Sequence, residues 1–452
     1  MSLCLLLPLD MMAEDMYRFR VYLKDKGNSG YTVDRPSEFL SDEAIARRDK
    51  FGIPVTEQDL PIAEDYFKML EENGGIPVCS SRWQSTIVVE CKDSSAVSRL
   101  LSLPMVKSVD WIWKGNLSAP EREIPEEKLL PDKLPLDNYY GFSEEQIKML
   151  NGIKLHHAGF DGEGMTVAVI DAGFENVDKI AVFDSLRLKG TYNVHFPGQT
   201  VYADDDHGTK VLSCMAANTP GVMVGTAPKA SYWLIESEDS SSEYPIEEDY
   251  WTAAVEYADS VGVDVITSSL GYFKYDAPEL SYKKEDLDGV VSFISRTATL
   301  AAEKGILMFC SAGNEGGGRW GKITFPGDAD KIVTVGAITK DKKRSNFSSV
   351  GPSADLRVKP DLVALGTDCQ VISPDGELSE ANGTSFSTPI LAGLGACLWQ
   401  ALPSLDNQTI IKLLRESGSQ YKKPDKEFGY GIPNVYKAYK RGLKYVPKSK
   451  RK

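Results

Sequence analysis

Short, mostly apolar runs recur through the second half of the chain, and they constrain its fold more than any other feature. Four of them cover residues 166–170, 263–267, 306–310 and 331–335. The runs are rich in β-branched residues, and stretches with helical spacing separate them, for example 209–217, 251–261 and 293–304. A strand that is apolar on both sides is typical of a parallel sheet covered by helices on both faces. The sequence therefore predicts an α/β domain.

A proline-rich stretch over residues 116–140 divides the chain. It holds four prolines among acids and lysines, and proline interrupts both helices and sheet ladders. We interpret it as a linker between a first domain over 14–115 and the α/β domain over 141–445. The first domain shows two-residue alternation as well as helical spacing, so a small α+β unit is expected. Its expected strands cover 17–23, 85–90 and 106–113, and its expected helices cover 41–48, 65–72 and 94–103.

The two ends of the chain fall outside these domains. Residues 1–13 are largely apolar and look like the core of an export signal, although no basic residue precedes them. Residues 446–452 are basic, and we expect them to form a frayed tail. Neither segment contributes to the predicted fold.

Charge and composition exclude several classes of protein. The chain has 51 Lys and Arg against 65 Asp and Glu, a net charge of −14, and nucleic-acid binding is not expected because phosphate contacts need clustered cations. No apolar run approaches the ~20 residues that cross a bilayer, so no membrane span is expected. Seven cysteines without a C-x-x-C pair predict buried or partly buried thiols. No zinc-type spacing occurs, and we assign no metal ligands.

Four polar residues stand where predicted elements begin or end. Asp171 ends a buried strand, at the edge where open α/β sheets hold their sites. His207 opens a predicted helix, and Ser385 lies in a Gly-Thr-Ser turn just before an apolar helix. Asn314 follows another buried strand in a Gly-rich loop, where an amide can donate to an oxyanion. Taken singly, each also has an ordinary explanation as a turn residue, a helix cap or a buried polar group.

The order of these residues is more specific than any one of them. Asp, then His, then Ser is the order found in subtilisin, and it differs from the orders of chymotrypsin and the α/β-hydrolases. The strings Asp-Ala-Gly, His-Gly-Thr, Ser-Ala-Gly-Asn and Gly-Thr-Ser-x-Ser-x-Pro all match one family. Over about residues 145–440 the sequence resembles the subtilisin-like serine proteases, the subtilases. The resemblance implies a subtilisin-like parallel sheet flanked by helices.

The resemblance also implies a role for each residue. Ser385 would be the nucleophile, His207 its general base, and Asp171 the carboxylate that orients the imidazole. Asn314 would donate to the oxyanion. A broad endopeptidase acting on proteins or peptides is expected, since pairing with substrate backbone gives affinity with little sequence choice. Ser269, Leu270 and Gly271 would pair with that backbone, and Ser311, Ala312 and Gly313 would form a wall of the pocket for the residue before the scissile bond.

Residues 14–115 occupy the place of the subtilase propeptide. The stretch 81–89 resembles a segment in the propeptide region of some bacterial subtilases. The resemblance implies an intramolecular inhibitor that assists folding, and hence a zymogen. It further implies a secreted or periplasmic enzyme, because latency protects the cell that makes a protease. The chemistry needs no cofactor; structural calcium is common in subtilases, but the sequence lets us place no ligands for it.

Two questions stay open at the level of sequence. The same residues suit a transpeptidase or peptide cyclase that excludes water, and a peptide-binding protein without turnover is a further alternative. The stretch 236–249 carries seven Asp or Glu residues. It would either favour basic side chains in the substrate or form a solvated loop of an acidic protein.

Overall fold

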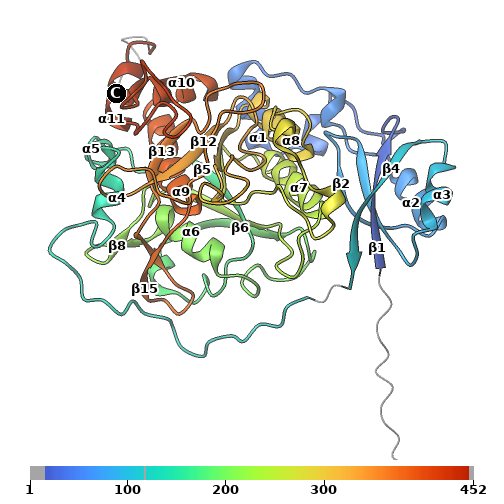
Figure 1. The fold of residues 1–452 in the computed structure, drawn as a ribbon, viewed down its shortest axis with the longest axis horizontal. Coiled ribbons are helices and arrows are strands. Elements are labelled where there is room, and N and C mark those ends of the chain that lie inside the picture. The colour runs from blue at the N-terminus through green and yellow to red at the C-terminus, as the bar shows by residue number, and fades with distance from the viewer. Residues whose placement is uncertain (1–15, 117–118, 447–452) are drawn as a thin grey trace, which may run out of the picture.

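The expected parallel sheet forms the centre of the larger domain (Figure 1). The strands are β5 (Thr166–Asp171), β6 (Arg187–Asn193), β9 (Ser231–Glu236), β10 (Val265–Ser268), β11 (Leu307–Ser311), β12 (Val333–Ile338) and β13 (Leu362–Leu365). The computed structural model describes residues 16–116 and 119–446, and within these residues the seven strands lie in the order β13-β12-β11-β10-β5-β9-β6. Every neighbouring pair in this sheet is parallel. The predicted α/β architecture is therefore confirmed.

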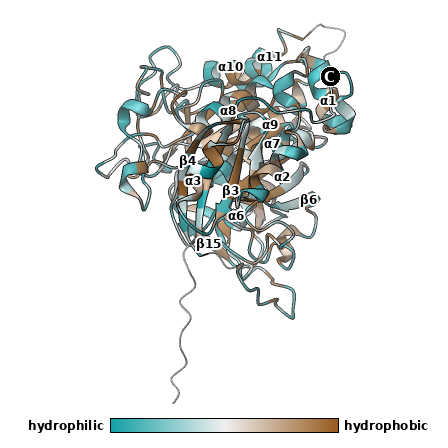
Figure 2. Cartoon of the chain, turned by 90° about the vertical axis from the view of Figure 1, so that its right-hand side faces the viewer, coloured by the Kyte–Doolittle hydropathy of each residue, from teal (hydrophilic) through white to brown (hydrophobic). Residues whose placement is uncertain are grey.

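Helices cover both faces of the sheet. They are α4 (Glu144–Lys148), α5 (Gly152–His157), α6 (His207–Ala216), α7 (Ile246–Ser260), α8 (Phe293–Glu303), α9 (Thr384–Ala401), α10 (Asn407–Ser417) and α11 (Val435–Gly442). Side chains of a strand point alternately to the two faces, so Val167 and Val169 of β5 join the core with α6 and α9, while Ala168 and Ile170 join the core with α7 and α8. Figure 2 shows the result, with apolar residues gathered inside and hydrophilic residues over the outside.

Four short strands form two small antiparallel ribbons beside the main sheet in the described chain. They are β7 (Asn218–Thr219) with β8 (Met223–Val224), and β14 (Cys369–Ile372) with β15 (Leu378–Ala381). The second ribbon lies between the end of β13 and the start of α9, so it leads the chain back to the carboxyl edge of the sheet.

The first domain is a small α+β unit, as expected. It contains β1 (Met16–Leu23), α1 (Asp42–Phe51), α2 (Glu64–Glu72), β2 (Ile76–Ser81), β3 (Thr86–Cys91), α3 (Ala96–Leu101) and β4 (Val106–Gly115). Its described strands form one antiparallel sheet in the order β2-β3-β1-β4. One face of this sheet packs on α2 and α3. Val88 and Trp113 on the other face join the core with α7 and α8 of the larger domain.

Helix α1 lies over the larger domain, away from the sheet of the first domain (Figure 1). The Ser41 side chain caps it by accepting from the backbone N–H of Ala44 at 3.2 Å. The backbone N–H of Ser41 donates to the carbonyl of Ser260 at the end of α7, 2.8 Å away. The ring of Phe51 stacks on Trp399 of α9 with the centroids 6.0 Å apart. This helix therefore anchors the first domain at a second place.

The predicted linker crosses the surface of the larger domain without forming a helix or strand in its described part. It is nevertheless attached at several points. The backbone N–H of Leu129 donates to Lys179, 3.0 Å away, and the Leu129 carbonyl accepts from Ala181 at 2.8 Å. Further along, the N–H of Leu136 donates to Gly221 at 2.8 Å.

Three differences from the sequence prediction concern the sites described below or the first domain. Strand β2 was not expected, because Pro77 and small polar residues weaken its pattern. Helix α7 begins at Ile246, so the end of the acidic stretch 236–249 is helical. Ser385 lies inside the first turn of α9 rather than in a turn before it. The leader 1–13 and residues 447–452 of the tail lie outside the described residues.

Two further predictions can be compared with the structure: that the thiols are buried or partly buried, and that no segment spans a membrane. Cys79 is half-buried and free, and five further described cysteines are buried and free, so the prediction of buried or partly buried thiols is confirmed for them. In residues 16–116 and 119–446, every helix is too short or too polar to cross a bilayer.

Candidate active site

Asp171 and His207 meet at the carboxyl edge of the sheet. Asp171 is the last residue of β5 and is fully buried, and His207 is the first residue of α6. Imidazole Nδ1 lies 2.6 Å from carboxylate Oδ1. Burial opposes a charged imidazolium, but the Asp171 carboxylate outweighs it and raises the pKa of His207 above its ordinary value. Because Nδ1 faces the carboxylate, Nε2 is the ring nitrogen left to exchange a proton with another group.

Ser385 reaches the same edge from α9. Its hydroxyl donates to the carbonyl of Ser269 at 3.4 Å, and the Ser269 hydroxyl donates to the carbonyl of Ser385 at 2.8 Å. The next residue, Phe386, has its ring 6.0 Å from the imidazole of His207, measured between centroids. No hydrogen bond joins Ser385 to His207 in the described chain. Such contacts are often long before substrate binds, so the arrangement still suits a nucleophile beside its base.

Asn314 presents its amide in one orientation. It lies three residues beyond the end of β11 and is exposed. Its Oδ1 accepts two hydrogen bonds from Thr384, one from the backbone N–H and one from the hydroxyl, both at 2.9 Å. The backbone donor requires an acceptor, so the oxygen faces Thr384 and the NH₂ group faces away. Asn314 can therefore donate to a group beside Ser385.

The six predicted substrate-contact residues lie directly after β10 or at and after the end of β11, and these two strands are neighbours. The Ser311 hydroxyl donates to the carbonyl of Leu270 at 3.2 Å, so the two segments run beside one another. Gly313 has a φ of +92°, and a Cβ there would lie 2.7 Å from Thr324. All six residues lie at the edge that holds Asp171, His207 and Ser385: Ser269, Leu270, Gly271, Ser311, Ala312 and Gly313.

Most carboxylates of the stretch 236–249 are buried, so the interpretation as a solvated loop is wrong. Glu236, Glu247, Glu248 and Asp249 are each less than 5% exposed. Burial, reinforced by Asp204, raises the pKa of Glu236 to about 8. These acids fall into two groups, one beside the candidate active site and one under the first domain.

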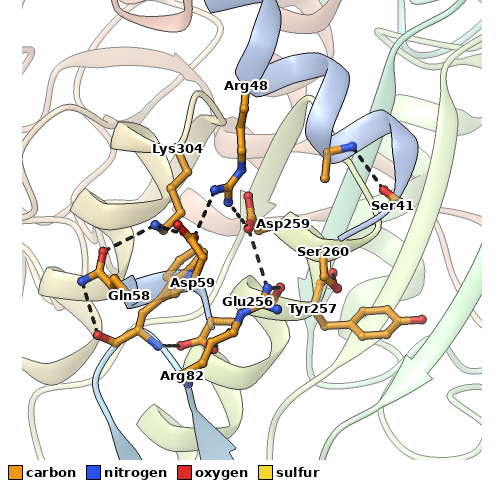
Figure 3. A network of polar contacts seen from close by, with 12 residues as sticks. Ser41, Arg48, Gln58, Asp59, Arg82, Glu256, Tyr257, Asp259, Ser260 and Lys304 are labelled. Carbon is orange, nitrogen blue, oxygen red and sulfur yellow. Dashed lines mark hydrogen bonds and ion pairs between the residues drawn. The ribbon is translucent and has the colours of Figure 1, made fainter. Parts of the chain in front are cut away.

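Arginines of the first domain partner the second group and also Asp259, a further acid of α7. Arg20 of β1 donates to both carboxylate oxygens of Asp249, with Nε 2.8 and 3.0 Å from them. Arg47 and Arg48 of α1 both bind Asp259, the latter at 2.6 Å. In return Lys304 of the larger domain lies 2.7 Å from Asp59 of the first domain (Figure 3). The side chains of these ion pairs are nearly all buried, and each charge has a partner of opposite sign.

Glu256 of α7 binds the segment whose sequence resembles a propeptide. Its Oε1 accepts from the backbone N–H of Trp83 at 3.1 Å and from the hydroxyl of Ser81, and its Oε2 accepts from the N–H of Arg82 at 2.9 Å. Figure 3 shows Arg82 and Glu256 beside Asp259. The turn that follows β2 is therefore held by a carboxylate of the other domain.

Sequence reasoning did not assign two further groups of residues at these sites. Thr384 lies within the Gly-Thr-Ser signature, and its position next to Ser385 was the available signal for its contact with Asn314. The arginines that bind α7 gave no such signal, because Arg20 and Asp249 lie 229 residues apart in the chain. Among the described residues, no group of three or more His, Cys, Asp or Glu side chains is arranged to hold a metal ion.

Known proteins match both domains. A model described as the subtilase family matches residues 162–431, and a model described as the peptidase S8 propeptide domain of Bacteroidota matches residues 18–128. Subtilisin NAT of Bacillus subtilis subsp. natto is 31% identical over 300 residues, which are 65% of this chain and 70% of that protein. An alkaline protease of Alkalihalobacillus alcalophilus is 28% identical over 403 residues, 88% of this chain and 93% of that protein. M-protease of Shouchella clausii is 24% identical over 404 residues, 88% and 92% of the two chains.

Proposed function

The chain belongs to the subtilase family of serine endopeptidases and carries a propeptide domain of that family, and from this premise we propose that Asp171, His207 and Ser385 form its catalytic triad. The contact between Asp171 and His207 is the observation that carries the proposal. It joins the ends of two elements 36 residues apart, at the edge that also holds Ser385 and Asn314. Together these groups supply a base, a nucleophile and an oxyanion donor.

The first proposed step is acylation of Ser385. Its Oγ attacks the scissile carbonyl carbon while the hydroxyl proton passes to Nε2 of His207. Asp171 holds Nδ1 and stabilises the imidazolium that forms. The C–N bond then breaks, and His207 returns the proton to the leaving amine. Water then attacks the carbonyl carbon of the acyl-enzyme while His207 accepts its proton. The bond to Ser385 Oγ breaks, His207 returns the proton to Oγ, and the product leaves as a carboxylate. All these steps use the chain's own side chains.

Asn314 would stabilise the charge that develops on the carbonyl oxygen. Thr384 holds its amide oxygen, which leaves the NH₂ group for the oxyanion. The backbone N–H of Ser385 would be the second donor. A donor aligned before the reaction needs no reorganisation when charge appears, so it favours the transition state over bound substrate.

The first domain would act as an intramolecular inhibitor until the linker is cut. Its β4 packs against the larger domain beside the candidate active site, since Nε1 of Trp113 donates to the Ser242 hydroxyl at 3.2 Å. Ion pairs with α7 and α8 hold it there. Such latency suits a secreted or periplasmic protease, because the enzyme becomes active only away from the machinery that makes it.

Intact mass of the purified chain after incubation tests the proposal. We expect the wild type to lose about 115–140 amino-terminal residues, the length up to the end of the linker. Ser385→Ala should stay whole, because it lacks the nucleophile. Ser387→Ala is a matched control on the same helix, and it should be processed like the wild type. If Ser385→Ala is processed at the wild-type rate in the absence of other proteases, Ser385 is not the nucleophile and the proposal is wrong.

A further inference from the structure

A cavity of about 410 Å³ lies beside the candidate active site, and acids dominate its lining. Ala172, the residue after Asp171, forms part of its wall, and so does Asp205, which accepts a hydrogen bond from the backbone N–H of His207 at 2.7 Å. We call it the acidic pocket, and its remaining lining residues are Glu238, Asp239, Ser240, Ser241, Ser242, Glu243, Glu247 and Asp276. Six carboxylates and no basic side chain thus surround this space.

The pocket carboxylates have no cation of their own. Among the described residues, none of the six forms an ion pair with Lys, Arg or His, although the acids further along α7 all do. Glu247 is the clearest case. It is 1% exposed, and its Oε2 has no hydrogen-bond partner in the described chain. A buried carboxylate oxygen without a partner is costly, and a cation beside it removes that cost.

The carboxylates of the acidic pocket also repel one another, because they carry the same charge. Burial, followed by the nearby Glu238 and Glu243, raises the pKa of Glu247 well above its ordinary value. Burial and Asp276 raise the pKa of Glu243 to about 7. Without a ligand the raised pKa values favour neutral carboxyls, and a positive ligand would shift both groups towards their charged forms.

The position of the pocket indicates where such a ligand comes from. Tyr272 follows the predicted substrate edge, Ser269 to Gly271, and its hydroxyl donates to Glu238 at the pocket. Ser385 lies at the other end of that edge, bound to Ser269. Tyr272 lies three residues beyond Ser269, and an extended peptide advances about 3.3 Å per residue. A substrate paired with this edge would therefore bring a residue a few positions from the scissile bond beside the pocket. The first domain supports this path, since β4 ends at Gly115 and its Trp113 contacts Ser242 on the pocket rim.

We propose that the acidic pocket binds a Lys or Arg side chain of the substrate, two to four residues before the scissile bond. The proposal rests on the proposed function and names its preferred substrate: a protein segment with a basic residue upstream of the cut. A side chain is favoured over a metal ion because, among the residues that the structure describes, no three of these ligands are arranged to hold one. Arg suits the site best, since its planar group carries five donors for several carboxylates at once.

Fluorogenic peptides that differ at one upstream position test the proposal. Each pair carries either Arg or its neutral isostere citrulline at one of the three positions, and kcat/KM is measured with the processed wild-type chain. At one position we expect Arg to be preferred about tenfold or more, the discrimination that one charge-assisted hydrogen bond provides. Equal rates at all three positions, with both peptides cleaved, would overturn the proposal and leave the proposed function intact.

Substitutions in the acidic pocket then show whether its carboxylates cause the preference for Arg over citrulline. Glu247→Gln and Glu243→Gln keep the size of the side chain and remove its charge, and each should lower the Arg-to-citrulline ratio towards one. Glu303→Gln removes an exposed acid on α8, outside the pocket, and should keep the wild-type ratio. A preference that survives both pocket substitutions places the basic side chain elsewhere and contradicts the proposal. If no peptide is cleaved by any form, the proposed function itself fails.

Discussion

The two sides of the α/β domain use carboxylates in opposite ways. At the carboxyl edge of the sheet, Oδ1 of Asp171 contacts the imidazole of His207 and the backbone N–H of Ala172. In the described chain, the other oxygen of Asp171 and one oxygen of Glu247 have no hydrogen-bond partner. Under the first domain, Asp249 and Asp259 are equally buried, but arginines fill their hydrogen-bonding capacity. A buried acid that keeps an oxygen without a partner is thus a candidate for function, whereas a buried acid held by arginines is a candidate for stability. A substitution at the edge should therefore lower kcat, whereas a substitution at the interface should lower the free energy of unfolding.

The largest expected effect is at the edge. Asp171→Asn keeps the shape of the side chain but favours the wrong tautomer of His207, so kcat should fall roughly 10⁴-fold. Denaturant unfolding, measured in parallel, should show a folded protein. Asp178→Asn, an exposed acid near the linker, serves as the control and should keep the wild-type kcat. An unfolded Asp171→Asn protein would break the comparison, because the edge would then be a stability site.

The next effect concerns the interface. Asp259→Asn leaves two buried arginines, Arg47 and Arg48, with a weakened partner, and should lower the free energy of unfolding by about 3–5 kcal/mol. The measurement is urea unfolding in a Ser385→Ala background, which prevents cleavage during the experiment. Asp184→Asn removes an exposed partner of Lys128 and should change the free energy by less than about 1 kcal/mol. Equal losses for the two variants would contradict the assignment of Asp259 to the interface.

A somewhat smaller loss is expected at the proposed oxyanion donor, Asn314. Asn314→Ala should lower kcat about 10²–10³-fold, or roughly 3–4 kcal/mol, as the loss of such a donor does in subtilisin itself. Thr384→Val removes only one of the two hydrogen bonds that orient the Asn314 amide. Its loss should therefore be smaller, and a KM near the wild-type value in both variants would separate transition-state stabilisation from substrate binding. If Asn314→Ala keeps the wild-type kcat, the amide of Asn314 is not the donor.

The smallest effects are changes with pH. They compare the activity that depends on the edge with the stability that depends on the interface. Asp171 raises the pKa of His207, and only the neutral imidazole can accept the serine proton, so kcat/KM should fall with acid at a pH above the ~6.5 of an ordinary histidine. At the interface, burial opposes the charge of Asp59, but Lys304 and Arg48 hold its pKa at about 2. A lowered pKa means that the stability from Asp59 is complete above its ordinary value of ~3.9 and is lost as the pH falls through about 2.

Between these two ranges the enzyme should be inactive while the ion pairs of Asp59 persist. Burial raises the pKa values of Asp249 and Glu256, so their contacts with the first domain should weaken at a higher pH than those of Asp59. Fluorescence of Trp83 and Trp113, both buried between the domains, can follow the interface in Ser385→Ala while kcat/KM of the wild type is measured at each pH. Exposure of these tryptophans near pH 6 would show that acid opens the interface before Asp59 is protonated.

The fold and the position of the candidate site were largely predictable because both depend on local pattern. The buried strand ending at Asp171 and the helix opening at His207 follow from apolar spacing and from the rule that parallel sheets hold sites at their carboxyl edge. Strand β2 escaped detection because an edge strand with Pro77 has little hydrophobic pattern to show.

The pairing of charges could not be predicted, since it depends on contacts between distant segments. The acids 247–249 look alike in sequence, yet Glu247 faces the acidic pocket while Asp249 meets Arg20, because consecutive helical residues point in different directions. Only the packing of the first domain on α7 shows which acids are neutralised. The residues of the proposed triad carry a family signature, whereas those of the interface carry none.

The attachment of the linker has a consequence for how the two domains part. While the chain is whole, the linker keeps the first domain at a high effective concentration, which for short flexible tethers reaches the millimolar range. Its hydrogen bonds at Leu129 and Leu136 hold the later part of the linker on the larger domain. A cut ahead of Leu129 would leave that part with the enzyme and turn the first domain into a separate ligand. Its release would then depend on dilution, so a concentrated preparation should gain activity more slowly than a dilute one.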